Sequence, residues 1–370
     1  MEREFIYTIQ DVHKMWERDY ETQIGVMQSK IIEAIVKTNG DIAVSYSGGK
    51  DSGMLLYMTA RVWYMFYGNA RPLVVIFANT GCEFKSMFGF IKWYVSWLEE
   101  RCGIKIDLRK ASAKQPFAQT VREIGYPFPS KKIARMISDV RKQMRDLGID
   151  YHCVKPCIRG GIKGAEAMRE MGFSHVAVCD ITGIKSNNQP GTCVIPAKWA
   201  PLLDAEFEVS EKCCAIHKKG PIHAIEQEMG GLLPMIGEMA ANSRTRMESY
   251  RRTGCNKLFG GNRVSKPMGP VTEQVVNRYY YETRLPLSPP YGEAIKDGDI
   301  YKFSGEQNTG CKLCGFGIMY DWDRFDRLSR LEPETVKWAF GRVEDGGLGY
   351  TEVCRYINAE CKGKIVIPKL

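Results

Sequence analysis

A glycine-rich turn between an apolar strand and an apolar helix most constrains how this chain can fold. Residues 41 to 46 have the apolar pattern of a buried strand, and residues 54 to 66 have that of a buried helix. The turn that follows the strand reads Ser47-Gly48-Gly49-Lys50-Asp51-Ser52. Because glycines stand where a strand gives way to a helix, the pattern predicts a loop whose amide groups face an anion at the helix N-terminus.

Further strands and helices alternate along the chain. Apolar runs at residues 73 to 77, 104 to 108, 175 to 180 and 232 to 236 are predicted strands, whereas residues 21 to 38 and 84 to 101 have helical spacing. This alternation predicts an α/β fold with a parallel, Rossmann-like sheet and helices on both faces. Ligands of such sheets bind beyond the carboxyl ends of the strands, where the glycine-containing loops are expected.

The composition is that of a globular protein. The chain has 370 residues, of which 44% are hydrophobic and 26% charged, which excludes disorder, collagen-like repeats and coiled coils. The apolar stretch from 53 to 66 is interrupted by Arg61 and is shorter than the roughly 20 residues that span a bilayer. The first five residues lack the pattern of a secretory signal. We therefore expect a cytoplasmic protein without a membrane partner.

The charge and the cysteine content point to particular kinds of chemistry. A net charge of +9 favours polyanionic partners such as nucleotides or nucleic acid. Thirteen cysteines are many for a reducing compartment, where clustered cysteines more often indicate metal or sulfur chemistry than disulfides.

The turn contains the groups that phosphate binding requires. The amides of Gly48 and Gly49 would face a phosphate, and the hydroxyls of Ser47 and Ser52 would donate hydrogen bonds to its oxygens. Lys50 would add a mobile positive charge, and Asp51 would help to hold Mg²⁺. The spacing is neither that of a Walker A loop nor that of the dinucleotide fingerprint. The alternative is a tight turn that binds no ligand.

The same turn resembles the PP-loop of the ATP pyrophosphatases, which cleave ATP between the α and β phosphates and adenylate a substrate. Thr80-Gly81-Cys82-Glu83 resembles the TGxE segment of the branch that contains the phosphoadenosine phosphosulfate (PAPS) reductases. Further agreement covers most of residues 40 to 360: Lys212-Cys213-Cys214, Ile236-Gly237, Ser243-Arg244, Lys266-Pro267, Leu285-Pro286-Leu287-Ser288 with Tyr291, and Gly310-Cys311-Lys312-Leu313-Cys314.

The resemblance implies a division of the chain into three parts. Residues 1 to 40 would be an N-terminal helical segment, residues 41 to 264 a PP-loop nucleotide-binding domain, and residues 265 to 370 a mostly helical, cysteine-bearing segment. Residues 131 to 170 look like an insertion. Within it, a basic helix from Lys131 to Arg145 either contacts nucleic acid or presents a solvated charged face.

Four cysteines are candidate metal ligands. Cys213 and Cys214 are adjacent, and Cys311 and Cys314 form a CxxC pair. Four thiolates bind either Zn²⁺ or an iron–sulfur cluster. The arrangement is similar to that of adenosine phosphosulfate (APS) reductases that carry a 4Fe-4S cluster, so iron and sulfur are favoured. The cysteines at 82, 102, 179 and 193 are expected to be small buried hydrophobes, and Cys153 and Cys157 to be loop thiols rather than a second metal site.

Two further candidate sites depend on arginines, a nucleotide contact and an activated thiol. Arg244 and Arg246 follow a predicted strand, where the resemblance implies contacts to the nucleotide, although Met239 stands where the reductases usually have arginine. Cys255 follows these and further arginines, which would lower the pKa of its thiol. Three roles stay open for Cys255: a catalytic persulfide carrier, a competing cluster ligand and a structural thiol.

Two enzymatic functions are therefore compared. The first is an ATP pyrophosphatase that uses ATP, Mg²⁺ and the 4Fe-4S cluster in sulfur transfer or nucleic acid thiolation, with Lys50, Asp51 and Cys255 as catalytic residues and a sulfur donor protein as a partner. The alternative is an APS or PAPS reductase that forms sulfite. Against the reductase, the PP-loop is intact, and only Glu360-Cys361 matches its C-terminal nucleophile motif. A nucleotide-binding regulator without chemistry is a third candidate. The sulfur acceptor and the oligomeric state, including a homo-oligomer, stay open.

Overall fold

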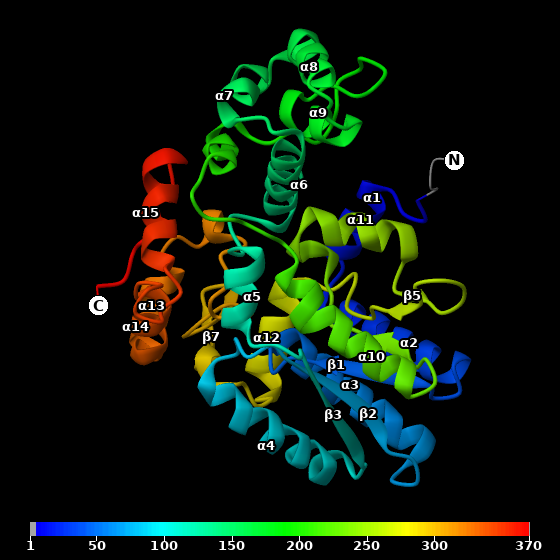
Figure 1. Ribbon diagram of the computed structural model, residues 1–370. Coiled ribbons are helices and arrows are strands. Elements are labelled where there is room, and N and C mark those ends of the chain that lie inside the picture. Colours follow the sequence, from blue (N-terminus) through cyan, green and yellow to red (C-terminus); the bar gives the residue numbers. More distant parts are fainter. Residues whose placement is uncertain (1–4, 370) are drawn as a thin grey trace. The chain divides into compact units, whose positions relative to one another are not determined.

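A six-stranded sheet forms the centre of the fold in the computed structural model, which describes residues 5 to 369 (Figure 1). Its strands are β1 (Ile42–Tyr46), β2 (Leu73–Asn79), β3 (Ile106–Ser112), β4 (Leu233–Met235), β5 (Asn256–Lys257) and β6 (Val264–Ser265). The spatial order is β3-β2-β1-β4-β6-β5. Neighbours are parallel except β5, which pairs antiparallel with β6 at the edge. The predicted α/β fold with a mostly parallel sheet is confirmed.

Helices cover both faces of this sheet, as the alternation of apolar residues requires. On one face, α3 (Lys50–Tyr67) and α4 (Lys85–Cys102) pack against the strands, with the rings of Tyr46 and Tyr94 5.6 Å apart. On the other face, α10 (Gly220–Glu228) packs Ile222 and Ile225 against Ala43, Ile76 and Ala111. The sheet is therefore covered on both faces, and loops form the edge at the carboxyl ends of its strands.

The chain divides into two compact units, and the sheet lies entirely in the first, residues 1 to 113 with 217 to 311. The other helices of this unit are α1 (Ile9–Trp16), α2 (Tyr20–Lys37), α11 (Arg244–Thr253) and α12 (Glu273–Thr283). The chain also forms short turns η3 (Ala215–Lys219), η4 (Ala240–Asn242) and η5 (Pro289–Tyr291) and an unforeseen antiparallel hairpin, β7 (Ala294–Asp297) with β8 (Ile300–Phe303).

This division differs from the one expected from the sequence. A boundary between residues 264 and 265 would cut β6, and it would separate α12 from α2 and α3, against which α12 packs. The hydroxyl of Tyr280 on α12 donates to the carbonyl oxygen of Lys50 at 2.7 Å. Residues 265 to 311 and the helices before β1 therefore belong with the sheet.

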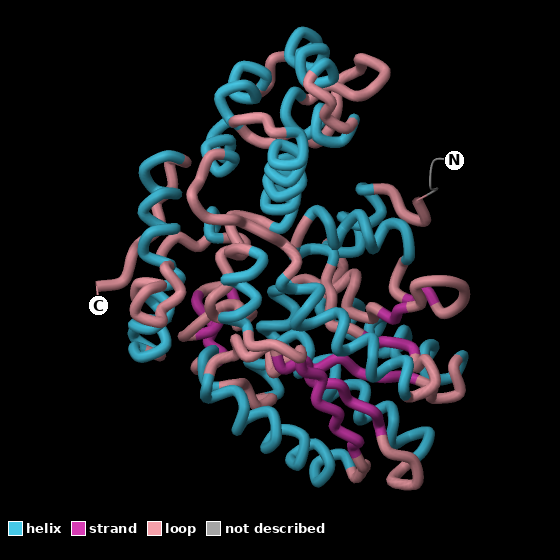
Figure 2. Tube along the Cα trace, in the orientation of Figure 1, coloured by secondary structure: helices cyan, strands magenta, loops and turns pink. Residues whose placement is uncertain are grey.

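The second unit, residues 114 to 216 with 312 to 370, consists of helices and loops in its described part (Figure 2). Ring contacts join its two stretches, because Phe128 lies 5.6 Å from Tyr350 and 6.0 Å from Phe325. Its helices are α5 (Phe117–Ile124), α6 (Lys131–Leu147), α7 (Tyr151–Val154), η1 (Lys155–Cys157), α8 (Gly161–Glu170), α9 (His175–Thr182), η2 (Ala197–Leu203), η6 (Ile318–Tyr320), α13 (Arg324–Leu331), α14 (Pro333–Phe340) and α15 (Tyr350–Glu360).

The strand predicted at residues 175 to 180 is wrong, because these residues form α9. The Ser174 side chain caps the helix by accepting from the amide of Ala177 at 3.4 Å, and Gly183 ends it with a left-handed φ of 78°. The buried residues Ala177, Val178 and Ile181 follow helical rather than alternating spacing. The β-branched valines suggested a strand, and the capping residues on either side outweighed them.

No helix among residues 5 to 369 is long and apolar enough to cross a membrane. Residues 1 to 4, on which most of the N-terminal signal assessment depends, lie outside the described part of the chain.

Val176 tests the assignment of α9. Its side chain is 57% exposed on the helix, so Val176→Ala should leave the free energy of unfolding unchanged or raise it by about 0.5 kcal/mol, because alanine is the better helix former. Ser174→Ala should lower it by about 1 kcal/mol through loss of the cap. Urea denaturation measures both. A loss on the order of 2 kcal/mol for Val176→Ala, as for a buried strand residue, would contradict the helix.

Candidate functional site

The glycine-rich turn lies at the carboxyl end of β1 and leads directly into α3, as the sequence predicts. Gly48 adopts a φ of +75°, and a Cβ atom there would lie 2.8 Å from the Cε atom of Met87. Gly49 is the N-cap residue of α3 and provides no side-chain cap. The left-handed backbone conformation therefore favours glycine at position 48, and a larger residue would also displace the end of the Met87 side chain.

The turn lies beside the point where the strand order reverses. From β1 the chain runs outward to β2 and β3 on one side, and it returns after β3 to β4 on the other side of β1. The loop after β4 approaches the turn closely, because a Cβ on Gly237 would lie 3.1 Å from the backbone of Asp51 and Ser52. Open α/β sheets bind their ligands in the crevice at this position.

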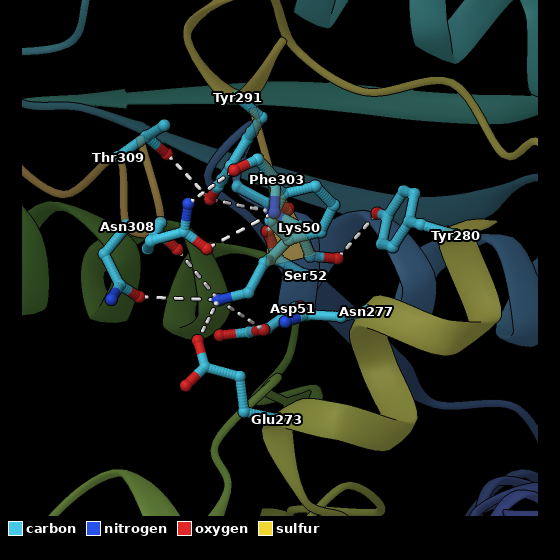
Figure 3. A network of polar contacts seen from close by, with 12 residues as sticks. Lys50, Asp51, Ser52, Glu273, Asn277, Tyr280, Tyr291, Phe303, Asn308 and Thr309 are labelled. Carbon is cyan, nitrogen blue, oxygen red and sulfur yellow. Dashed lines mark hydrogen bonds and ion pairs between the residues drawn. The ribbon is translucent and has the colours of Figure 1, made fainter. Parts of the chain in front are cut away.

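Lys50 is the buried centre of a polar network (Figure 3). Its side chain is 2% exposed, and its ammonium group lies 3.2 Å from Glu273 Oε1 and 3.5 Å from Asp51 Oδ1. It also donates to the Gln307 carbonyl at 3.1 Å and to Asn308 Oδ1 at 3.4 Å. Burial opposes the charge, but the nearby acidic groups outweigh burial and raise the pKa of Lys50. The lysine is therefore charged and held by several acceptors.

Asp51 combines burial with an oxygen that is available to a cation. Burial raises the pKa of its carboxyl group, and the positive charges of Lys50 and Arg246 oppose that effect. Its Oδ1 atom is buried, makes no hydrogen bond among the residues that the structure describes, and lies 3.5 Å from the Lys50 ammonium group. A buried carboxylate oxygen without a hydrogen bond at this turn fits the predicted role of Asp51 in holding Mg²⁺.

The Tyr291 hydroxyl holds the backbone at Lys50, the first residue of α3. The Tyr291 hydroxyl accepts from the Lys50 amide at 3.0 Å and from the Thr309 hydroxyl at 3.0 Å. Tyr291 was part of the family resemblance, but Glu273, Asn308 and Thr309 were missed. They lie more than 220 residues from Lys50 in the chain, and no local pattern of residue types distinguishes them.

The hydroxyl groups of the turn bond within the turn itself. Ser52 Oγ accepts from the Ser47 amide at 3.2 Å and lies 3.0 Å from Ser47 Oγ. Ser52 Oγ also donates to the Gly49 carbonyl at 3.1 Å. The two serines therefore fix the shape of the loop, and their predicted contact to phosphate stays a prediction.

The loop after β2 folds on itself through Thr80 and Glu83. Glu83 Oε1 accepts from the Thr80 amide at 3.1 Å and from the Thr80 hydroxyl at 2.7 Å, while Gly81 takes a φ of +75°. The sulfur of Cys311 lies 3.6 Å from the Thr80 hydroxyl. The TGxE segment is thus a rigid turn, and one predicted cluster ligand lies against it.

Three basic residues lie near the ends of β4 and β6. Arg244 and Arg246 are exposed in the first turn of α11, which Ser243 caps, and the charge of Arg246 acts on Asp51. Lys266 is buried and bonds Glu238 at 2.9 Å and Ser249 at 2.7 Å. Of the two arginines, Arg246 is thus electrostatically coupled to the candidate loop.

Cys255 does not have the reactive environment predicted for it. Its side chain is 5% exposed and packs with Val12, Ala240 and Tyr250. Burial raises the pKa of this thiol, although the Tyr250 hydroxyl, 3.6 Å from the sulfur, and Lys30 oppose the rise. The expected lowering by the arginines of α11 is wrong, and the environment favours the structural role.

The predicted cluster ligands occupy different parts of the chain. Cys213 and Cys214 immediately precede the π-helical turn η3, and with Cys314 they belong to the second unit, whereas Cys311 belongs to the first. Cys213 is buried, and the other three are half-buried. Within residues 5 to 369, no group of three His, Cys, Asp or Glu side chains is arranged to hold a metal ion. No preformed site is therefore described, and the cluster stays a prediction.

The C-terminal thiol that the reductase would require is poorly suited to nucleophilic attack. Cys361 is buried, and burial, with a contribution from Glu360, raises its pKa to about 12. The paired thiols of the insertion are structural as well, because Cys157 donates to the Cys153 carbonyl at 3.9 Å and burial raises its pKa. Cys153 and Cys157 lie in helical turns rather than in a loop.

The basic side chains of α6 are largely committed within the second unit. Arg141 donates to the Leu202 and Phe207 carbonyls at 3.1 and 2.7 Å, and Arg145 pairs with Glu208 at 2.6 Å. Arg135 pairs with Asp139 at 2.9 Å. These contacts favour a structural charged face over a nucleic acid contact for this helix.

No family model matches the chain, and a search of curated proteins finds no significant match.

Tyr291 tests the network around Lys50. Tyr291→Phe would leave the buried Lys50 amide without its acceptor, which should lower the free energy of unfolding by about 1 to 3 kcal/mol. The control, Tyr320→Phe, removes a hydroxyl from a side chain that is 87% exposed and should change it by less than about 0.5 kcal/mol. Equal effects in urea denaturation would show that the hydroxyl of Tyr291 does not hold the turn.

Proposed function

We propose that the chain is a PP-loop ATP pyrophosphatase that cleaves ATP to AMP and pyrophosphate and so adenylates a substrate, in sulfur transfer or nucleic acid thiolation. The observation that carries the proposal is the buried pair of Lys50 and Asp51 on the first turn of α3, at the reversal point of the sheet. A tight turn without a ligand would not need a charged lysine and a carboxylate oxygen that makes no hydrogen bond in one buried place.

Each residue of the turn has a role in this reaction. The backbone amides of the turn would bind phosphate oxygens, and the ammonium group of Lys50 would stabilise the charge that develops on the leaving pyrophosphate. Asp51 would hold Mg²⁺, which neutralises phosphate charge when bound. Arg246, exposed at the next helix N-terminus, would contact the nucleotide.

Phosphate oxygens of a bound nucleotide would replace some of the acceptors around Lys50. Glu273 is half exposed and lies 3.2 Å from the ammonium group, so an incoming phosphate would replace it without burying a new unpaired charge. The other acceptors, the Gln307 carbonyl and Asn308 Oδ1, are neutral and would not repel the anion. The network thus keeps the lysine charged and oriented before the substrate binds.

Removing the charge of Lys50 should abolish most of the activity. With ATP and Mg²⁺, Lys50→Gln should release pyrophosphate on the order of 10²-fold more slowly than the unmodified chain. Lys302→Gln is the matched control, because Lys302 is exposed and pairs with Asp297 on the β7–β8 hairpin. Thermal unfolding is recorded for both variants to separate lost chemistry from lost fold.

Two outcomes would overturn this proposal. Unchanged pyrophosphate release in folded Lys50→Gln would exclude the loop as the reaction site. Sulfite release from APS or PAPS, without ATP cleavage, would instead make the chain a reductase. Its nucleophile would then have to be a thiol other than Cys361, whose pKa burial raises to about 12.

We also propose that Cys213, Cys214, Cys311 and Cys314 hold a 4Fe-4S cluster. The support is their number, their spacing in the sequence and the chemistry of four thiolates. No step of the reaction above depends on the cluster.

Iron binding tests this assignment. After anaerobic reconstitution, the unmodified chain should bind about four iron atoms and show visible absorption of the cluster, and Cys311→Ser should lose most of both. Cys153→Ser, which changes an exposed thiol, is the control and should bind iron normally. Stoichiometric iron in Cys311→Ser, or zinc in the chain as isolated with no iron after reconstitution, would contradict the proposed ligands or metal.

A further inference from the structure

The segment after α9 folds back along the end of that helix. The Gly191 amide donates to the Gly183 carbonyl at 2.6 Å, and the Ile195 amide donates to the Asp180 carbonyl at 2.7 Å. An isolated antiparallel bridge pairs Ile184 with Pro190. Residues 190 to 195 therefore run back beside residues 180 to 184, which brings two cysteines that are fourteen positions apart to the same place.

Cys179 and Cys193 meet in this fold-back. The Cys179 thiol donates to the Cys193 carbonyl oxygen at 3.7 Å. A Cβ on Gly191 would lie 2.5 Å from the Cys179 sulfur, so the returning chain passes the thiol at a distance that only glycine permits. Both cysteines are half-buried, not enclosed, so a small molecule can reach them.

The two thiols differ in their electrostatic surroundings. The positive charge of Lys132, on α6, lowers the pKa of the Cys193 thiol, and the Thr192 hydroxyl at 3.9 Å adds to the effect. Burial and the carboxylate of Asp180 oppose it. Burial raises the pKa of Cys179, as do Asp180 and Cys193, and Lys185 opposes the rise only in part. Cys193 is thus the better nucleophile, and Cys179 stays protonated beside it.

We propose that Cys193 and Cys179 form a dithiol site that reduces small disulfides by thiol–disulfide exchange. The Cys193 thiolate attacks one sulfur of the disulfide RSSR, which breaks its S–S bond, forms a mixed disulfide on Cys193 and releases RS⁻. Cys179 then gives up its proton and attacks the Cys193 sulfur, which forms the Cys179–Cys193 bond and releases a second RS⁻. The chain loses two electrons and two protons, and one disulfide becomes two thiols.

The charge of Lys132 distinguishes a dithiol exchange site from two alternatives for this cysteine pair, a metal site and two inert buried thiols. The positive charge that Lys132 brings to Cys193 would repel a cation bound to the pair, so it favours exchange chemistry over metal binding. Both thiols were expected to be small buried hydrophobes; both cysteines are only half-buried, and the positive charge near Cys193 does not fit that role. The site does not depend on the proposed ATP chemistry.

The test offers 2-hydroxyethyl disulfide to the reduced full-length chain and maps the products by peptide mass spectrometry. The unmodified chain should form a Cys179–Cys193 crosslink faster than any other pair. Cys179→Ser should accumulate the mixed disulfide on Cys193, and Cys193→Ser should leave Cys179 unmodified on the same time scale. A first adduct on Cys179, or a crosslink of Cys193 to another cysteine, would overturn the proposal.

The rate of alkylation reports the role of Lys132 directly. At neutral pH, Lys132→Gln should slow the alkylation of Cys193 by iodoacetamide about three- to tenfold, because a smaller fraction of the thiol is ionised. Lys142→Gln, a change at an exposed lysine on the same helix, should leave the rate unchanged. An equal rate in Lys132→Gln and the unmodified chain would show that Cys193 has no activating partner, and the assignment of the nucleophile would fail.

Discussion

The charge of Lys50 organises the loops at the carboxyl end of β1. A buried ammonium group is costly unless carboxylates and carbonyl oxygens surround it, and here they come from α3, α12 and the segment after β8. The packing of these segments at the end of β1 is therefore tied to one side chain. The Tyr291 hydroxyl fixes the amide of the same residue, and the Tyr280 hydroxyl fixes its carbonyl. Residues 273 to 308 therefore both stabilise the charge of the Lys50 side chain and fix the position of its backbone.

The parts of this arrangement that follow from local sequence were predictable. The strand before the turn, the helix after it and the glycine that turns the backbone each depend on a few neighbouring residues, and β1, α3 and Gly48 match the expectation. The groups that hold Lys50 were not predictable, because Glu273 and Asn308 are ordinary polar residues until folding brings them to the lysine. Similarly, the valines near residue 176 favour a strand in isolation. The helix α9 forms because Ser174 caps its N-terminus and Gly183 caps its C-terminus.

Cysteine reactivity shows the same division between local and long-range causes. Neighbours in the sequence suggested an activated thiol at Cys255 and an inert one at Cys193. Folding reverses this order, because Cys255 lies in an apolar cluster, whereas the charge of Lys132 on α6 acts on Cys193 in the loop after α9. The charge that changes the pKa of a thiol has to lie within a few ångströms in space, and a count of nearby arginines in the sequence does not measure that distance.

The basic groups of the chain differ in whether they are already paired, which bears on where we expect a polyanion to bind. The net charge of +9 is a property of the whole chain, but many basic groups are already paired. Arg135, Arg141 and Arg145 of α6 bond carboxylates and carbonyls of their own unit. Arg244 and Arg246, in contrast, are exposed at the N-terminus of α11, and Arg246 is coupled to Asp51. Under the proposed function, a phosphate that displaces Glu273 from Lys50 would gain the charge of that lysine and lie near the N-terminus of α11, so we expect the anion at the strand ends rather than on α6.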